Sequence, residues 1–170
     1  MQLLPKKITM NADDNRIGFY KNTKLILLAD DDADDCMFFE NAIEELGIPA
    51  KIVCVHDGES VMQWLTDNNV LPDIIFLDIN MPCKNGAECL EEIKAIEHLK
   101  NIPIVIISTS LEKDIIVSLH KNGALFYIRK PSLFAHLKIL LSHVINLVEV
   151  GNCPQPAIEN FVVRAETHAL

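Results

Sequence analysis

Five short apolar runs alternate with longer amphipathic stretches between Lys24 and Val148. The runs have the length of strands, and the stretches space their apolar residues as one face of a helix does. Strands that alternate with helices indicate βα units, because two parallel strands need a crossover connection between them. The alternation therefore predicts an α/β fold built on a parallel sheet.

The predicted strands are residues 25–29, 51–55, 74–77, 104–107 and 126–129. Helix signals lie between them: Asp32 can cap the first helix, Gly47 closes it, and a later helix is expected around residues 112–121. Five βα units in roughly 125 residues are typical of a doubly wound, flavodoxin-like (βα)5 domain. We expect a five-stranded parallel sheet with strand order 2-1-3-4-5.

The chain has 170 residues, 49% of them hydrophobic, which is enough for one sizeable core. We expect an N-terminal extension at residues 1–23, one domain at 24–148 and a C-terminal tail at 149–170. Residues 151–156 contain one glycine and two prolines and are typical of a linker. The residues beyond this linker are too few for a DNA-binding or catalytic output domain.

Charge and cysteine content exclude several classes of protein. The net charge of −9 disfavours nonspecific binding to nucleic acid or to an anionic membrane. Five cysteines without a C-x-x-C pair support neither a zinc site nor a disulfide framework. No apolar run approaches the length of a membrane span, and no apolar segment follows the N-terminal lysines as in a secretory signal. We therefore expect a cytoplasmic protein with reduced cysteines.

Four of the predicted strands end in residues that suit phosphate or metal chemistry. The first runs into Asp30-Asp31-Asp32, the third stops at Asp78, the fourth at Ser108, and the fifth at Lys130. Strand ends of a parallel sheet share one edge, so these side chains can converge although they are far apart in sequence.

The acidic residues at these strand ends indicate a cation site. Two carboxylates about 5 Å apart repel by roughly 3 kcal/mol at an effective dielectric of about 20, so such a cluster shares protons or holds a cation. Asp30, Asp31 and Asp78 offer the hard oxygen ligands that suit Mg²⁺. Asp32 and its acidic followers at 34 and 35 are better explained as a solvated helix start.

Together the residues divide the work of in-line phosphoryl transfer: Asp78 is the nucleophile, Ser108 donates a hydrogen bond, and Lys130 pairs with the remaining charge. Each of the last two alone has a plainer explanation, since strand-end hydroxyls bond to nearby backbone and most lysines are solvated. Pro131 lowers the cost of a cis bond, and such a bond could aim Lys130; a trans bond that starts the next helix is the alternative.

Four segments carrying these residues resemble the receiver domains of two-component response regulators. They are LLADDDADD at 27–35, PDIIFLDINMPCKNG at 72–86, IPIVIISTS at 102–110 and NGALFYIRKPS at 122–132. The resemblance spans about residues 24–148, with the motifs in their usual order. It implies that Asp78 is the phosphoacceptor and that Asp30 and Asp31 hold Mg²⁺, with the backbone carbonyl of Asn80 as a further ligand.

The resemblance also implies partners and a switch. The phosphoryl group would come from a sensor histidine kinase, a histidine phosphotransfer protein or a small acyl phosphate, and would be lost by slow self-catalysed hydrolysis. Asn80 and Ser110 occupy positions that tune that loss. Ser108 and Tyr127 match the switch pair, so phosphorylation would change the face formed by the fourth helix, fifth strand and fifth helix, where a downstream protein binds. A plain core aromatic is the alternative for Tyr127.

The function expected is therefore a stand-alone phosphoacceptor signalling domain rather than an enzyme. The sequence does not decide whether the domain is a monomer or a homodimer. A relay that passes the phosphoryl group onward is equally compatible, and a degenerate receiver that only binds partners is disfavoured by the intact acids, hydroxyl and lysine. The rival is a Mg²⁺-dependent aspartyl-phosphate phosphatase of the haloacid-dehalogenase type. That family generally has a second acid two residues after its nucleophile, where this chain has Asn80, and a cap domain, for which there is little room.

Overall fold

A computed structural model describes residues 23–149 and 153–165. Except for its last residue, the expected N-terminal extension lies outside the described residues. Strands and helices alternate along the chain in this order: β1 (Lys24–Ala29), α1 (Ala33–Glu45), β2 (Ala50–Val55), α2 (Gly58–Asp67), β3 (Ile74–Leu77), α3 (Gly86–Ala95), β4 (Ile104–Ser108), α4 (Lys113–Lys121), β5 (Phe126–Arg129), α5 (Phe134–Glu149), α6 (Ile158–Phe161) and β6 (Val162–Val163).

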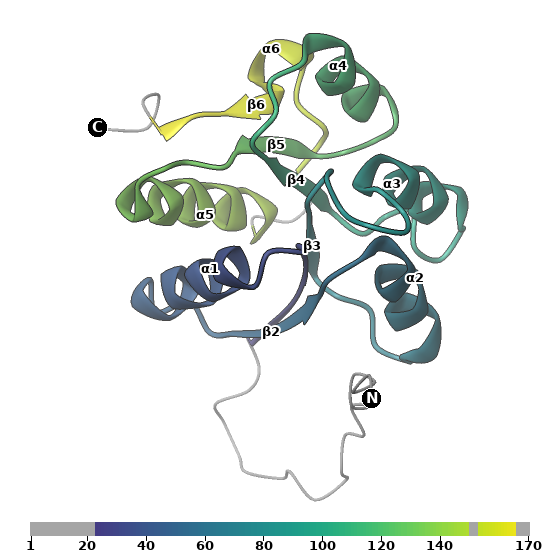
Figure 1. The fold of residues 1–170 in the computed structure, drawn as a ribbon, viewed down its shortest axis with the longest axis horizontal. Helices are drawn as coiled ribbons and strands as arrows, with labels where there is room; N and C mark the ends of the chain where they lie inside the picture. The colour runs from purple at the N-terminus through teal and green to yellow at the C-terminus, as the bar shows by residue number, and fades with distance from the viewer. Residues whose placement is uncertain (1–22, 150–152, 166–170) are drawn as a thin grey trace, which may run out of the picture.

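The strands form one parallel sheet in the order β2-β1-β3-β4-β5-β6. Helices α1 and α5 cover one face of the sheet, and α2, α3 and α4 cover the other (Figure 1). The doubly wound α/β fold and the order 2-1-3-4-5 are confirmed. The expected strand count of five was wrong, because β6 adds a sixth strand beside β5.

Burial explains why the central strands are apolar at nearly every position. All residues of β3 and β4 are buried, since helices pack against both faces of the sheet. Alternate side chains point to opposite faces, so Leu77 joins the core under α2–α4 while Phe76 joins the core under α1 and α5. In a strand that is buried on both faces, polar side chains occur only at the ends. The polar residues of these strands therefore lie at the rim of the sheet.

Two helices of the site begin with side-chain caps, of which the one at Asp32 was predicted and is confirmed. The side chain of Asp32 accepts a hydrogen bond from the backbone N–H of Asp34 at 2.9 Å and caps α1. Asn85 and Glu88 form a capping box at the start of α3, in which each side chain accepts from the other residue's backbone N–H. Both helices begin just after a site strand, so the caps fix the loops that surround the strand ends.

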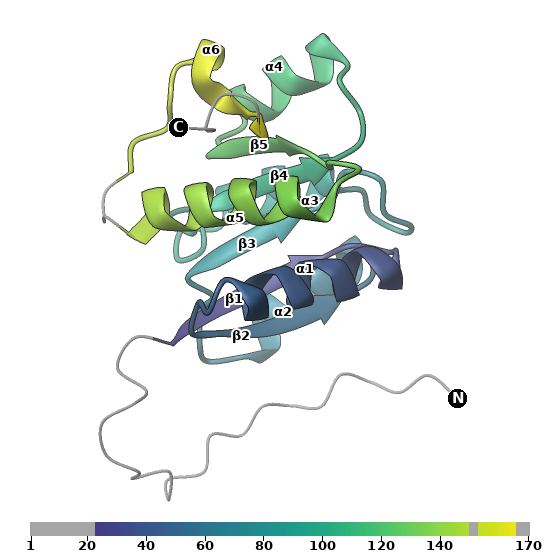
Figure 2. The same ribbon diagram turned by 90° about the vertical axis from the view of Figure 1, so that its left-hand side faces the viewer.

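The C-terminal segment was not expected to join the sheet. Residues 153–165 run beside α4 and β5, and β6 pairs in parallel with β5 through Tyr127–Val162 and Ile128–Val163 (Figure 2). Two residues are too few to show a strand period, so local pattern carries no signal for this element. Within the described part of the chain, no helix is long and apolar enough to cross a membrane.

Candidate functional site

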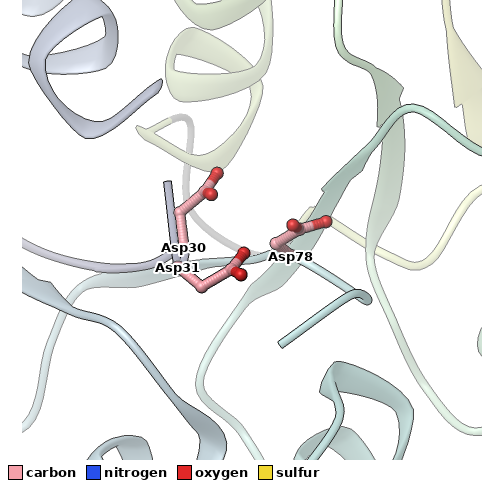
Figure 3. Close-up of side chains that lie close together, drawn as sticks. All are labelled: Asp30, Asp31 and Asp78. Carbon is pink, nitrogen blue, oxygen red and sulfur yellow. The ribbon is translucent and has the colours of Figure 1, made fainter. Parts of the chain in front are cut away.

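The three predicted metal-binding acids meet at one rim of the sheet. One carboxylate oxygen from each of Asp30, Asp31 and Asp78 lies within 4.8 Å of the others (Figure 3). Asp30 is 2% and Asp78 4% exposed, whereas Asp31 is exposed to solvent. The cluster therefore has two buried ligands and one side that opens outward.

Strand pairing accounts for this meeting. The backbone N–H of Asp30 donates to Val55 at the end of β2, and the N–H of Asp78 donates to Ala29 at the end of β1. The two aspartates are therefore the first residues beyond adjacent parallel strands, held at one level by the sheet's own ladder. The prediction from shared strand ends is confirmed for this pair.

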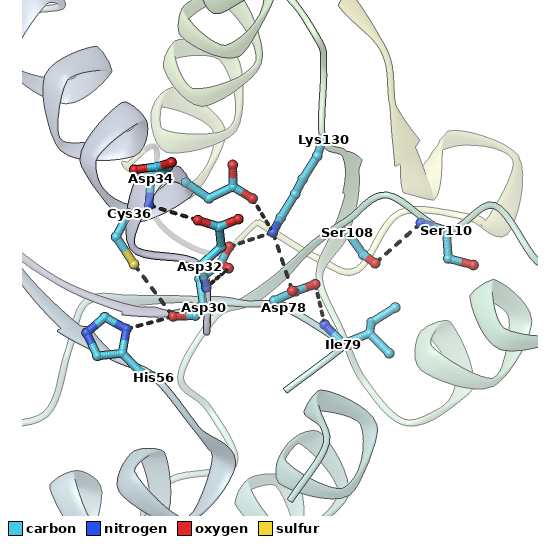
Figure 4. A network of polar contacts seen from close by, with 11 residues as sticks. Asp30, Asp32, Asp34, Cys36, His56, Asp78, Ile79, Ser108, Ser110 and Lys130 are labelled. Atoms are coloured by element: carbon cyan, nitrogen blue, oxygen red, sulfur yellow. Dashed lines mark hydrogen bonds and ion pairs between the residues drawn. The ribbon is translucent and has the colours of Figure 1, made fainter. Parts of the chain in front are cut away.

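Lys130 enters the cluster from the end of β5. Its ammonium lies 2.7 Å from Asp30 Oδ2 and 3.3 Å from Asp78 Oδ2 (Figure 4). It also lies 2.7 Å from Asp35 Oδ2. Burial would lower the pKa of Lys130, but hydrogen bonds to Asp30 and Asp35 outweigh it and raise the pKa above its ordinary value. The lysine is thus a fixed cation.

The bond that precedes Pro131 is trans, since no peptide bond among the described residues is cis. The cis candidate at Pro131 is therefore wrong for this structure. A cis bond is not needed to aim the neighbouring lysine, because its carboxylate contacts hold the ammonium in place.

Asp35 is the residue that sequence reasoning missed. It was assigned to the solvated start of α1, yet its carboxylate contacts Lys130 at 2.7 Å while its side chain stays 40% exposed. Asp35 stands four positions before Phe39, which is buried on α1, so both lie on the helix face that turns toward the sheet. That spacing is the signal that would have separated Asp35 from Asp34.

Asp30 has a second set of contacts behind the acid cluster. Its backbone carbonyl accepts a hydrogen bond from His56 Nδ1 at 2.9 Å and one from the Cys36 thiol at 3.6 Å. Burial raises the pKa of the Asp30 carboxyl, and the hydrogen bond to Lys130 opposes that rise. The backbone carbonyl of Asp30 is therefore held by one side chain from α1 and one that follows β2.

The loop after β3 folds closely over Asp78. The N–H of Ile79 donates to Asp78 Oδ1 at 2.7 Å, and the N–H of Gly86 returns to the Ile79 carbonyl at 3.0 Å. A Cβ at Gly86 would collide with the backbone carbonyl of Asp78, so only glycine allows this approach. Asn80, the predicted source of a carbonyl ligand, is an exposed residue of the same loop.

Ser108 and Tyr127 lie together beside the acids. Ser108 is fully buried at the end of β4, and its hydroxyl accepts a hydrogen bond from the N–H of Ser110 at 3.4 Å (Figure 4). Tyr127 is also fully buried, and its hydroxyl donates to the Ser110 carbonyl at 2.6 Å. Burial raises the pKa of the Tyr127 phenol. Ser110 thus joins the two residues of the predicted switch pair, whose switching role stays a prediction.

The charge balance fits a divalent cation. Four carboxylates, those of Asp30, Asp31, Asp35 and Asp78, lie at this rim with one ammonium, and three of them contact it, which leaves three negative charges uncompensated. All donors are hard oxygens, which suit Mg²⁺ or Mn²⁺ rather than a softer metal. The exposed side of the cluster leaves coordination positions for water or phosphate oxygens.

A cleft of about 310 Å³ opens next to the cluster, between α1 and the start of α5. Asp35 and Lys130 line its polar end, and Phe38 and Phe134 line its apolar end with their rings 6.3 Å apart. Asp30 also lines the cleft, so the cleft reaches one of the three clustered acids.

Comparisons with known proteins agree with this geometry. A family model for the response regulator receiver domain matches residues 26–142. The probable methanogenesis regulatory protein FilR2 of Methanothrix harundinacea is 32% identical over 118 residues, covering 67% of this chain and 76% of FilR2. Response regulator Rcp1 of Synechocystis sp. is 31% identical over 112 residues, covering 63% of this chain and 76% of Rcp1.

Solved structures give the same result. The phosphorylated cyanobacterial phytochrome response regulator RcpA superposes with a TM-score of 0.71 and 31% identity, covering 79% of this chain and 99% of RcpA. The Mn²⁺-bound form of Rcp1 superposes with a TM-score of 0.66 and 27% identity, covering 79% of this chain and 99% of that one. The sheet order, the strand-end acids and these matches agree, and the chain belongs to the response regulator receiver domain family.

Proposed function

We propose that this chain accepts a phosphoryl group on Asp78 and signals through a change in the surface that it offers to other proteins. One observation supports this most directly: Asp78 is a buried carboxylate beside two further acids and the ammonium of Lys130. Charged groups are seldom buried without a partner, and here the partners are those that phosphoryl transfer requires.

The transfer itself is an in-line displacement. A carboxylate oxygen of Asp78 attacks the phosphorus of a donor phosphohistidine, and a new O–P bond forms as the P–N bond breaks. The imidazole leaves with the electron pair of that bond. Lys130, 3.3 Å from Asp78 Oδ2, pairs with the charge of the incoming phosphoryl group, and the hydroxyl of Ser108 donates a hydrogen bond to it.

We propose Mg²⁺ as the cation, held by Asp30, Asp31 and Asp78, with the backbone carbonyl of Asn80 as a further ligand by family resemblance. When bound, the ion would neutralise phosphoryl oxygens that otherwise face an acidic cluster. The tight packing of Gly86 on Asp78 keeps the loop that carries Asn80 close to the acids.

The cleft between α1 and α5 is our proposed approach for a histidine kinase or phosphotransfer protein. Phe38, which lines the cleft, is 48% exposed, and Met37 and Leu133, sequence neighbours of lining residues, are 50% and 56% exposed. Large exposed apolar groups beside a reactive site are typical of a protein contact. Phe38→Glu should slow transfer from a phosphorylated kinase and leave phosphorylation by acetyl phosphate unchanged; equal slowing of both would refute this surface.

We propose that the downstream target binds the face formed by α4, β5 and α5. The alternative role in the pathway is that of a relay, which passes the phosphoryl group to a second histidine protein. The contacts through Ser110 support a route from the acid cluster to this face. A phosphatase of the haloacid-dehalogenase type is the alternative activity, but Asn80 stands where that family has its second acid.

The test is incubation of the full chain with Mg²⁺ and acetyl phosphate, followed by intact mass. We expect a gain of one phosphoryl group that is lost slowly, and no gain in Asp78→Asn or in EDTA. Multiple turnover of a phosphomonoester would favour the phosphatase. Absence of any phosphoryl gain in the wild-type chain would refute the proposal.

A further inference from the structure

Asp35 is a partner of Lys130 that no step of the proposed transfer uses. Its Oδ2 lies 2.7 Å from the Lys130 ammonium, which is as close as Asp30 Oδ2 lies. Asp78 Oδ2 is the most distant of the three partners, at 3.3 Å. A lysine ammonium has three N–H groups, and here each of them faces a carboxylate. To bond a phosphoryl oxygen on Asp78, the ammonium therefore has to give up a contact that it now makes.

Of the two short contacts, the one to Asp35 is easier to break. Asp30 is 2% exposed, and its Oδ1 accepts a hydrogen bond from the N–H of Asp32 at 3.1 Å. Without the ammonium, that carboxylate would be a buried charge without a cation. The Asp35 side chain is 40% exposed and stands in the first turn of α1, where water and the positive end of the helix stabilise a free carboxylate. Asp35 can therefore release Lys130 at a small cost in free energy.

The release needs no movement of helix α1. Phe39, one turn after Asp35, is 2% exposed and packs edge-on against Phe76 of β3, with ring centroids 4.8 Å apart. The Cys36 thiol donates to the backbone carbonyl of Asp30 at 3.6 Å. Close packing of this kind holds the backbone of the helix in place. A rotation of the Asp35 side chain within the cleft that it lines is therefore enough to free the ammonium.

We infer that Lys130 exchanges Asp35 for the phosphoryl group when Asp78 is phosphorylated, so that Asp35 restrains phosphorylation of the unmodified chain. This inference rests on the proposed function. A phosphoryl group carries about 1.5 to 2 negative charges, so it attracts the ammonium more strongly than one half-solvated carboxylate does. Because Asp78 is now the most distant partner, the ammonium has to shift toward it to bond a phosphoryl oxygen at the short distance that it keeps to Asp35.

The exchange makes Asp35 a positioning residue for the forward reaction, acting through Lys130. The ion pair stabilises the unmodified chain, and it is already broken when Lys130 bonds to the phosphoryl group in transfer. Removal of the Asp35 charge should therefore lower the barrier to phosphorylation. In the phosphorylated chain Asp35 is already free, so the rate of hydrolysis should not depend on its charge.

The test compares Asp35→Asn with the wild type, as full chains in Mg²⁺ and acetyl phosphate, with the phosphoryl gain followed over time by intact mass. We expect the variant to gain the phosphoryl group about fivefold faster, the upper value for an ion pair with one exposed partner. After removal of the donor, the phosphoryl group should be lost at the wild-type rate, to within about twofold. A general loss of structure would slow the gain, so acceleration separates the exchange from damage to the fold.

Two further variants are controls for charge and for the carboxylate itself. Asp34→Asn removes the same charge from the neighbouring exposed residue in the first turn of α1, and its rate of gain should stay within about twofold of the wild type. Asp35→Glu returns a carboxylate to the same position and should bring the rate back to within about twofold of the wild type.

The outcomes separate the exchange from the proposed function. An unchanged or slower gain in Asp35→Asn would overturn the exchange, and so would an equal acceleration in Asp34→Asn or in Asp35→Glu. A rate of loss that changes as much as the rate of gain would overturn it too, because Asp35 would then still act on the phosphorylated chain. In all of these cases the wild type gains a phosphoryl group and the proposed function stands. No gain in the wild type would refute the proposed function and the exchange with it.

Discussion

Replacing Asp78 by asparagine should stabilise the protein when no divalent ion is present. The substitution keeps the shape of the side chain and removes one negative charge from a cluster of carboxylates. A group placed for a reaction rather than for stability is expected to cost folding free energy, which its neutral analogue recovers. The prediction therefore separates a functional aspartate from a structural one.

The magnitude can be worked from the distances. Two carboxylates at 4.8 Å, the limit of the cluster, repel by about 3.5 kcal/mol at an effective dielectric of about 20, and Asp78 faces both Asp30 and Asp31. Lys130 attracts Asp78 at 3.3 Å by about 5 kcal/mol on the same scale. Solvent screening weakens the repulsion between Asp78 and the exposed Asp31. Burial of the Asp78 charge adds a desolvation penalty of several kcal/mol to the wild type. Because Lys130 keeps its contacts to Asp30 and Asp35, we expect a net gain of about 1–3 kcal/mol.

Urea unfolding in EDTA and in Mg²⁺ measures this gain in the free energy of unfolding. Asp78→Asn should raise the unfolding free energy in EDTA. Mg²⁺ should stabilise the wild type by about 2.7 kcal/mol at 100 times its dissociation constant, and the variant by less. Asp67→Asn makes the same chemical change on an exposed residue of α2 and should stay within about 0.5 kcal/mol of the wild type. A variant less stable than the wild type in EDTA would refute the reasoning.

Three further changes test separate parts of the site. Gly86→Ala should lower the unfolding free energy by about 1–3 kcal/mol and weaken Mg²⁺ binding in a calorimetric titration, because its Cβ meets the Asp78 carbonyl; unchanged Mg²⁺ affinity would contradict this. The raised pKa of Lys130 means that its stabilisation is fully present below about pH 10.5, its unfolded pKa, and is lost as pH rises through the higher folded value. The difference in unfolding free energy between wild type and Lys130→Met should therefore shrink above that pH, and a constant difference would be the contrary result. Asp35→Asn should lower the unfolding free energy by at most about 1 kcal/mol, because the side chain is 40% exposed; a loss above about 2 kcal/mol would place Asp35 within the buried site.

The sequence predicted those parts of the structure that depend on local pattern and on strand ends. The four residues of β3 are apolar because both faces of the sheet are covered, and the same fact made Asp78 conspicuous as a charge at the end of a buried run. Lys130 could be placed near it because parallel strands end at one edge. These inferences needed no knowledge of side-chain packing.

The features that were missed depend on tertiary contacts. Asp35 shares a helix face with Phe39, but only the position of Lys130, beyond the end of β5, gives its carboxylate a partner. Val162 and Val163 form a strand because the edge of β5 is beside them, and two residues carry no period of their own. Tyr127 is fully buried, and its ring lies 6.2 Å from that of Phe161, which comes from a segment that local pattern assigned to a tail.

Locating the phosphoryl group on the chain tests the central claim most directly. Borohydride reduces an aspartyl phosphate to an alcohol, so the modified residue becomes a homoserine that peptide mass spectrometry can place. After incubation with Mg²⁺ and acetyl phosphate, we predict homoserine at position 78 and at no other carboxylate. Homoserine at position 30, 31 or 35, or none in a sample that has gained phosphoryl mass, would contradict Asp78 as the acceptor.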